Sequence, residues 1–293
     1  MASLKEIKSR ISSVKSTKKI TSAMKMIASS KLHKAQNAIT NFLPYQQKLD
    51  NILTNLLASD ASYDSPFIQK RETQRIAIVV FASNSSLAGA YNANVIKEFN
   101  AVYDKKKNEL GKENILIYPI GKKIFDAVRK QGLKPEGDYK EMADKPAYQA
   151  VQDLAKILID KFVKKEIDDV VLIYHHFVST GSQKLLTKTF LPFDLSHDNE
   201  SDAKNEVQSD YILEPSKEEI LESLIPTVLY ARLYAALLDA NASEHAARMV
   251  AMQIASDNAD ELVQDLTVQY NKSRQQAVTN ELLDIIGGAS ALS

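Results

Sequence analysis

The chain has 293 residues, of which 44% are hydrophobic, so it can form one large or two modest folded domains. Its 37 basic and 37 acidic residues cancel, which excludes a global field that would attract nucleic acid or an anionic membrane. The absence of cysteine excludes disulfides, thiolate metal sites and cysteine nucleophiles. No apolar run approaches the ~20 residues that span a bilayer, and the N-terminus lacks the apolar core of a signal peptide, so we expect a soluble, cytoplasmic chain.

The first 60 residues predict one long coiled-coil helix. Between Leu4 and Leu57 the only helix breaker is Pro44. Apolar residues recur there with alternating three- and four-residue spacing, at positions 4, 7, 11, 14, 32, 35, 39, 42, 49, 53 and 56. This spacing is a heptad seam, and a helix of that length needs a partner helix.

The seam changes character between residues 17 and 36. Continuing its phase places Lys18, Thr21, Lys25 and Ala28 at seam positions, and puts Ile20, Met24 and Ile27 on another face. Unpaired lysines in a dry seam would cost several kcal/mol. Either the stripe rotates locally and leaves the lysines solvated, or this turn faces another chain. No acidic residue lies between Glu6 and Asp50, so an acidic surface would be the natural counterpart.

The middle of the chain, residues 74–213, predicts an α/β domain. β-Branched runs at 75–83, 113–121 and 168–178 alternate with helical stretches at 92–108, 122–131 and 148–165. This alternation is typical of a Rossmann-like domain with a mainly parallel sheet covered on both faces. Residues 182–193 predict an edge strand. The acidic stretch that follows, 194–210, predicts a mobile surface loop.

We searched this domain for chemistry and found no motif for it. The loop SNSSLAGAYN after the first strand has no G-x-G-x-x-G, and GKK at 121–123 lacks the rest of a phosphate loop. His175 and His176 are neighbours on a predicted strand, so they point to opposite faces and cannot both bind one metal ion. We therefore expect no catalytic residue, no cofactor and no metal site.

Residues 214–293 predict the second long helix. From 216 to 286 there is no glycine and one internal proline, and we expect the helix to stop at Gly287 and Gly288. Its seam positions are 221, 224, 228, 231, 235, 238 and 242, then 249, 252, 259, 263 and 266. Residues 1–57 hold ten basic and two acidic residues, whereas 216–286 hold eleven acidic and five basic. Opposite charges and a long intervening domain favour an antiparallel coiled coil of the two ends.

Four segments carry a resemblance to a known family. They are TKKITSAMKMIASSKLHKAQ (17–36), EPSKEEILESLIP (214–226), ASEHAARMVAMQIASDNADEL (242–262) and YNKSRQQAVTNELLDIIGGASAL (270–292). Together they resemble the gamma subunit of F-type ATP synthase. The resemblance implies a non-catalytic rotor shaft, one copy per complex, that couples proton-driven rotation to ATP synthesis or hydrolysis. It implies a coiled coil threading three alpha and three beta subunits, and an α/β domain contacting the epsilon subunit and the c-ring. It also implies a peripheral position at the cytoplasmic face of the bacterial inner membrane.

The resemblance also assigns contacts with the beta subunits. It implies that Lys18, Lys19, Met24 and Lys25 face an acidic lever loop, and that Arg248, Arg274, Gln275 and Thr279 meet catch loops. For both arginines the alternative is an ion pair on the flank of the coil. The end, 285–292, would be a bearing tip, or simply a fraying helix end. Ser85, Ser86 and Ala88 stand where many members have a glycine-rich loop.

Two other function classes remain open at this point. A coiled-coil nucleic-acid-binding protein would use the basic N-terminal helix on phosphates, but it would need no matched acidic helix. A small-molecule enzyme built on the α/β domain would need a nucleotide or a metal ion.

Overall fold

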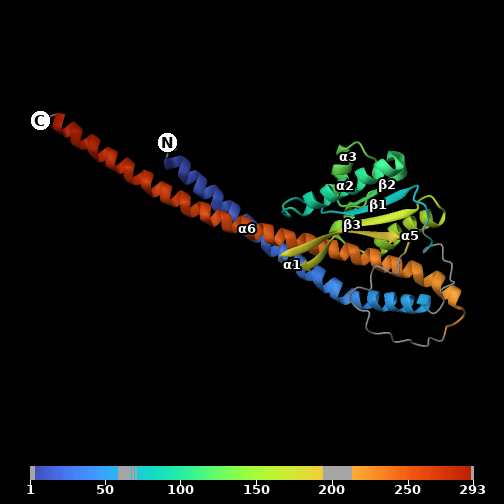
Figure 1. Ribbon diagram of the computed structural model, residues 1–293. Coiled ribbons are helices and arrows are strands. Elements are labelled where there is room, and N and C mark those ends of the chain that lie inside the picture. Colours follow the sequence, from blue (N-terminus) through green and yellow to red (C-terminus); the bar gives the residue numbers. More distant parts are fainter. Residues whose placement is uncertain (1–3, 59–66, 68, 70, 194–212, 292–293) are drawn as a thin grey trace. The chain divides into compact units, whose positions relative to one another are not determined.

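The computed structural model describes residues 4–58, 67, 69, 71–193 and 213–291 (Figure 1). The predicted acidic stretch 194–210 lies outside them. The chain divides into two compact units: residues 1–29 with 248–293, which we call the coiled-coil unit, and residues 30–247, which we call the domain unit. Each unit is considered by itself below.

Eleven elements follow one another in the part of the chain that the structure describes. Two long helices, α1 (Leu4–Ala58) and α6 (Lys217–Ala291), enclose the others in sequence. Between them lie β1 (Ile76–Phe81), α2 (Tyr91–Leu110), the 3-10 turn η1 (Lys112–Asn114), β2 (Ile115–Ile120), α3 (Lys122–Lys130), α4 (Lys140–Asp144), α5 (Tyr148–Val163), β3 (Asp169–Ser179) and β4 (Ser182–Leu191). The predicted strands and helices are therefore present, while the short helix α4 was not predicted.

The sheet is mainly parallel, as predicted. Its strand order is β2-β1-β3-β4. Ile76 of β1 lies opposite Ile115 of β2 and Asp169 of β3, and both pairings are parallel. β4 returns antiparallel to β3 through a short turn and ends the sheet. The predicted edge strand is confirmed.

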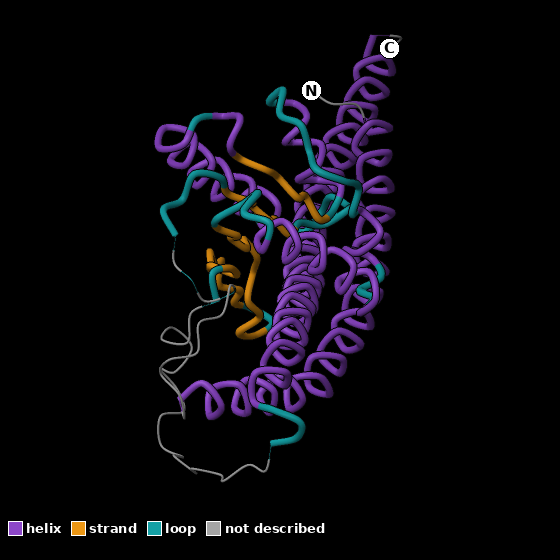
Figure 2. Tube along the Cα trace, turned by 90° about the vertical axis from the view of Figure 1, so that its right-hand side faces the viewer, coloured by secondary structure: helices purple, strands orange, loops and turns teal. Residues whose placement is uncertain are grey.

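Two hydrophobic clusters cover the sheet, one on each face. Figure 2 shows helices on both sides of the strands. On one face Val95 and Phe99 of α2 and Ile124 of α3 pack on β1 and β2. On the other face α5 packs together with the neighbouring parts of α1 and α6, through residues such as Leu158 and Leu229. Parallel strands are usually buried on both faces, and all six residues of β1 are buried.

The terminal helices contribute to the domain core as well as to the coil. Leu53, Leu56 and Leu57 of α1, and residues of α6 from Leu221 to Ala240, belong to one cluster with the sheet. The predicted segments 1–60, 74–213 and 214–293 follow chain order, whereas packing groups 30–58 and 213–247 with the domain unit. The seam prediction is confirmed, since none of its positions in either helix is exposed.

One sequence expectation about α6 needs correction. The helix does not stop at Gly287 and Gly288 but continues to Ala291, because glycine costs a helix only about 1 kcal/mol and does not break it as proline does. By length and composition α6 would also qualify as a membrane-spanning helix. A core helix of a soluble protein passes the same test, and 44% of the qualifying stretch of α6 is buried within the chain.

Candidate partner-contacting site

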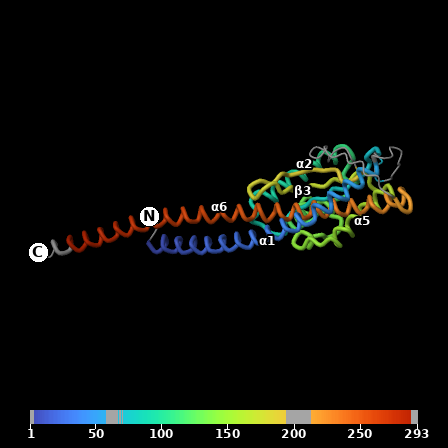
Figure 3. The backbone as a smooth tube through the Cα atoms, turned by 90° about the horizontal axis from the view of Figure 1, so that it is seen from below, coloured from blue at the N-terminus to red at the C-terminus, as the bar shows by residue number. Residues whose placement is uncertain are grey.

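In the coiled-coil unit α1 and α6 run side by side and antiparallel (Figure 3). At its centre two hydroxyl groups meet. Thr21 is 8% exposed and Ser256 is 6% exposed, and their side-chain oxygens lie 2.7 Å apart. Thr21 also reaches the carbonyl of Lys18 at 3.0 Å, and Ser256 that of Met252 at 2.9 Å. Two hydroxyl protons serve these three contacts, so one hydroxyl donates across the seam while the other donates to its own helix.

One turn away an ion pair ties the same two helices together. The Nζ of Lys18 lies 2.5 Å from Oδ1 of Asp260, and the two side chains are 40% and 45% exposed. Ala28 is buried in the predicted phase, and Ile20 and Ile27 are about 60% exposed on another face. The stripe therefore does not rotate at this turn. The seam keeps its phase through this turn, and its polar side chains on α1 are paired with polar side chains of α6.

The eight residues expected to contact beta subunits lie at separate levels of the coiled-coil unit. On α1, Lys19 is exposed, and Met24 and Lys25 are half-buried about two turns from the paired Lys18. On α6, Arg248 is only 8% exposed, so a partner reaches little of it as it stands. Arg274, Gln275 and Thr279 are exposed, and Thr279 donates a hydrogen bond to the carbonyl of Gln275 at 2.9 Å. Arg274 lies about 39 Å along the helix from Arg248, so these residues do not form one site.

The far part of α6 lies beyond the described residues of α1. Position 18 pairs with 260 and position 21 with 256, so the first described residue of α1, Leu4, falls opposite about residue 273 or 274. Among the described residues, α6 continues past this point to Ala291, as Figures 1 and 3 show. Its large apolar side chains there, Val278, Leu282, Leu283, Ile285 and Ile286, are all exposed.

Sequence reasoning missed Ser256 and Asp260. Both lie on α6 in the segment used for the family resemblance, but the prediction left the lysines of α1 without an internal partner. The available signal was spacing: Lys18 and Thr21 are three residues apart on α1, and Ser256 and Asp260 are four apart on α6, which suits facing pairs in an antiparallel coil. Without the register, several acidic residues of α6 were equally suitable partners.

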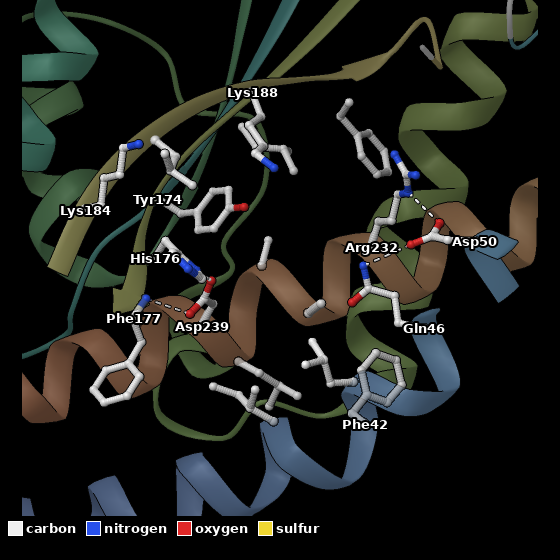
Figure 4. Close-up of a pocket in the computed structure, with 18 of the residues that line it drawn as sticks. Phe42, Gln46, Asp50, Tyr174, His176, Phe177, Lys184, Lys188, Arg232 and Asp239 are labelled. Carbon is white, nitrogen blue, oxygen red and sulfur yellow. Dashed lines mark hydrogen bonds and ion pairs between the residues drawn. The ribbon is translucent and has the colours of Figure 1, made fainter. Parts of the chain in front are cut away.

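The domain unit contains a groove of about 920 Å³ between α1, β4 and α6 (Figure 4). Its two carboxylates are already engaged. Asp50 accepts a hydrogen bond from Arg232 at 2.9 Å, and Asp239 is bound by the ring of His176 and, at 2.8 Å, by the backbone N–H of Phe177. Burial raises the pKa of Asp239, and the hydrogen bond from His176 acts against that rise. Both carboxylates link neighbouring elements.

His176 therefore lies on the α6 side of β3, whereas His175 is stacked on Tyr91 of α2. The two histidines point to opposite faces, as predicted. Among the residues that the structure describes, no group of three or more His, Asp or Glu is placed to hold a metal ion.

Replacing Arg232 with alanine is expected to destabilise the domain unit by about 2 kcal/mol. Its guanidinium group pairs with Asp50 and lies 4.5 Å from the ring centroid of Phe193, and both charged side chains are less than a quarter exposed. Denaturant unfolding of the full chain measures the loss. Lys106→Ala, which removes an ion pair with Glu109 within one helix, is the control and should cost about 0.5 kcal/mol or less. Equal losses would contradict the role of Arg232.

Comparisons with known proteins agree in pointing to one family. A family model described as ATP synthase matches residues 3–292. The ATP synthase gamma chain of Bacteroides fragilis is 58% identical over 291 residues, which is 99% of this chain and 100% of the relative. The gamma chain of Staphylococcus epidermidis is 38% identical over 292 residues, with full coverage of both chains.

Solved structures give the same fold. A chain of the rotor of the Euglena gracilis mitochondrial ATP synthase matches with a TM-score of 0.62 at 20% identity, over 94% of this chain and 98% of that one. A chain from the central stalk and c-ring of the Tetrahymena thermophila enzyme matches with a TM-score of 0.57 over 81% of this chain. None of these comparisons supports the alternative of a nucleic-acid-binding coiled coil.

Proposed function

This chain belongs to the ATP synthase gamma chain family, and we propose how its coiled-coil unit acts as the central rotor shaft of an F-type ATP synthase. The coil threads a ring of three alpha and three beta subunits, and one copy of the chain serves each complex. The domain unit contacts the epsilon subunit and the c-ring, at the cytoplasmic face of the bacterial inner membrane. The chain is not itself catalytic, and phosphate chemistry takes place on its neighbours.

The observation that carries this proposal is the unpaired, apolar end of α6. Eleven of the seventeen exposed large hydrophobic side chains among the described residues lie in the coiled-coil unit: Ile20, Met26 and Ile27 on α1, and Ile254, Leu262, Val268, Val278, Leu282, Leu283, Ile285 and Ile286 on α6. Exposed apolar surface of this kind marks a protein interface. A single helix is also only marginally stable in water. Other subunits packed around the coil would cover the exposed apolar side chains and would also support the single helix.

The lysines of α1 around Lys19, which we call the charged turn, supply a polar contact with those subunits. Lys19 is exposed, Lys25 is half-exposed, and no acidic residue interrupts α1 between Glu6 and Asp50. An acidic loop of a beta subunit can therefore form charge-assisted hydrogen bonds to this turn. As the shaft rotates, one beta subunit after another meets the lysines. Because the coil is asymmetric, the three beta subunits are held in different states at any moment.

A second level of contacts lies on α6. Arg274, Gln275 and Thr279 are exposed and lie at or beyond the level of Leu4, the first described residue of α1, so a partner can reach them. We assign them to catch loops of beta subunits. The mostly buried Arg248 would need its side chain to rearrange before it joined them.

Lys19→Glu is expected to lower ATP-driven proton pumping per ATP hydrolysed by about tenfold in the assembled complex, since one charge-assisted hydrogen bond is worth roughly 1.5–3 kcal/mol. Pumping into inverted membrane vesicles and ATP hydrolysis are measured on the same preparation. Lys97→Glu reverses an exposed lysine on α2 in the domain unit and serves as the control. If both variants pump like the unmodified complex, the charged turn does not contact a beta subunit.

A further inference from the structure

The ion pair of Lys18 and Asp260 lies in a part of the seam that steric packing defines poorly. The buried residue next to Asp260 in sequence is the small Ala259, 6% exposed, and the buried pair one turn away is Thr21 and Ser256. The larger Met252 and Leu266 lie about two turns from Asp260 along α6. Small side chains form shallow knobs, and shallow knobs distinguish weakly between alternative registers of two helices. Something else must therefore set how α1 is aligned against α6 at this level.

We propose that Asp260 is a positioning residue: by holding Lys18 beside the buried Thr21–Ser256 hydrogen bond, it fixes the register of α1 against α6 and the direction in which Lys19 points. This inference rests on the proposed function, in which that turn meets a beta subunit. It changes the part assigned to Lys18, which is an internal tether. The exposed cation for the partner is Lys19.

A hypothetical slip of the two helices by one heptad shows how the Lys18–Asp260 and Thr21–Ser256 pairs specify the register. In one direction Thr21 would face Val263 and Lys18 would face Thr267. In the other direction the same two residues would face Met249 and Gln253. Either slip removes the ion pair and the cross-seam hydrogen bond together. Polar residues in an otherwise apolar seam are a well-attested means of fixing register.

The tether also orients the neighbouring side chain. Successive residues of an α-helix point about 100° apart, so when Lys18 is held on the flank toward α6, Lys19 is directed away from it. In agreement, Lys19 is exposed and Lys18 is half-buried. A one-heptad slip would keep this direction but move Lys19 by about 10 Å along the coil, away from the level that a partner meets.

Cysteine cross-linking tests the register, because the chain has no cysteine of its own. The observed pairings extrapolate to Val14 facing Val263, whereas a one-heptad slip brings Val14 opposite Tyr270. In the full chain we expect the Val14→Cys, Val263→Cys protein to oxidise rapidly. The Val14→Cys, Tyr270→Cys protein should oxidise slowly.

Adding Asp260→Asn to the Val14→Cys, Tyr270→Cys protein should raise its slow oxidation rate about two- to fivefold, as expected for losing a half-exposed ion pair. With Asp260→Glu, or with the swap Lys18→Glu, Asp260→Lys, this oxidation rate should return to its original slow value.

The assembled complex tests the consequence for function. Asp260→Asn should lower proton pumping per ATP hydrolysed by about twofold or more, and Asp260→Glu should restore it. The inference is overturned if Asp260→Asn leaves cross-linking unchanged. It is also overturned if pumping stays at the unmodified value while Lys19→Glu lowers it. If Lys19→Glu has no effect on pumping but Asp260→Asn still shifts the cross-link, the contact with a beta subunit is wrong and the register role stands.

Discussion

Replacing Gly121 with alanine is expected to destabilise the domain unit by about 3 kcal/mol or more. Gly121 joins β2 to α3 with φ +101°, and an added Cβ would lie 2.1 Å from the carbonyl oxygen of Ala82. That oxygen cannot move aside cheaply, because the N–H of Ala82 is bonded to the carbonyl of Ile120 at 2.9 Å. Denaturant unfolding of the full chain, followed by circular dichroism, gives the loss in free energy of unfolding.

Gly111→Ala is the matched control for this prediction. Gly111 also has a positive φ, +85°, but an added Cβ there would meet nothing within 4 Å. Gly111→Ala therefore costs only the strain of a backbone conformation that is essentially restricted to glycine, about 1–3 kcal/mol. The difference between the two variants isolates the clash with the loop after β1. Equal losses would show that this loop yields to the new methyl group.

The sequence predicted the seams of both long helices because heptad spacing is a local property of the chain. Leu53 on α1 and Leu221 on α6 are fully buried, in the phase that the spacing indicated. The strands were also recognised, since short β-branched runs between helical stretches admit few other interpretations. α4 was missed because a five-residue helix is too short to show a helical period.

The pairing of the site residues could not be predicted, because it depends on how the two helices are aligned. Lys18 has several acidic residues of α6 as possible partners, and only the register selects Asp260. The same holds for Thr21, whose hydroxyl is satisfied across the seam by Ser256. A sequence pattern shows that a polar residue occupies a seam position. Which residue compensates for it is a tertiary property.

His175 occupies an unusually dry environment for a titratable group. It is 3% exposed, its ring stacks on Tyr91 with centroids 4.5 Å apart, and its Nδ1 has no hydrogen-bond partner. Burial lowers its pKa to about 4, because the charged imidazolium would lose its hydration there. The hydroxyl of Ser243 contacts only its backbone carbonyl.

The domain unit is therefore expected to lose stability as the pH falls from about 6.5 toward 4. Unfolding frees His175 to bind a proton near its ordinary pKa of about 6.5, while in the folded state it stays neutral until about 4. The contribution of neutral His175 to the free energy of unfolding is complete above pH 6.5. It declines as the pH falls toward 4, by about 3 kcal/mol in total.

His175→Phe keeps an aromatic ring against Tyr91 and removes the titration, so its unfolding free energy should fall less steeply over this range. Denaturant unfolding of both full chains at a series of pH values measures the difference, in which the carboxylates common to both cancel. Parallel curves would mean that the folded protein accepts a proton on His175 by opening the contact with α2.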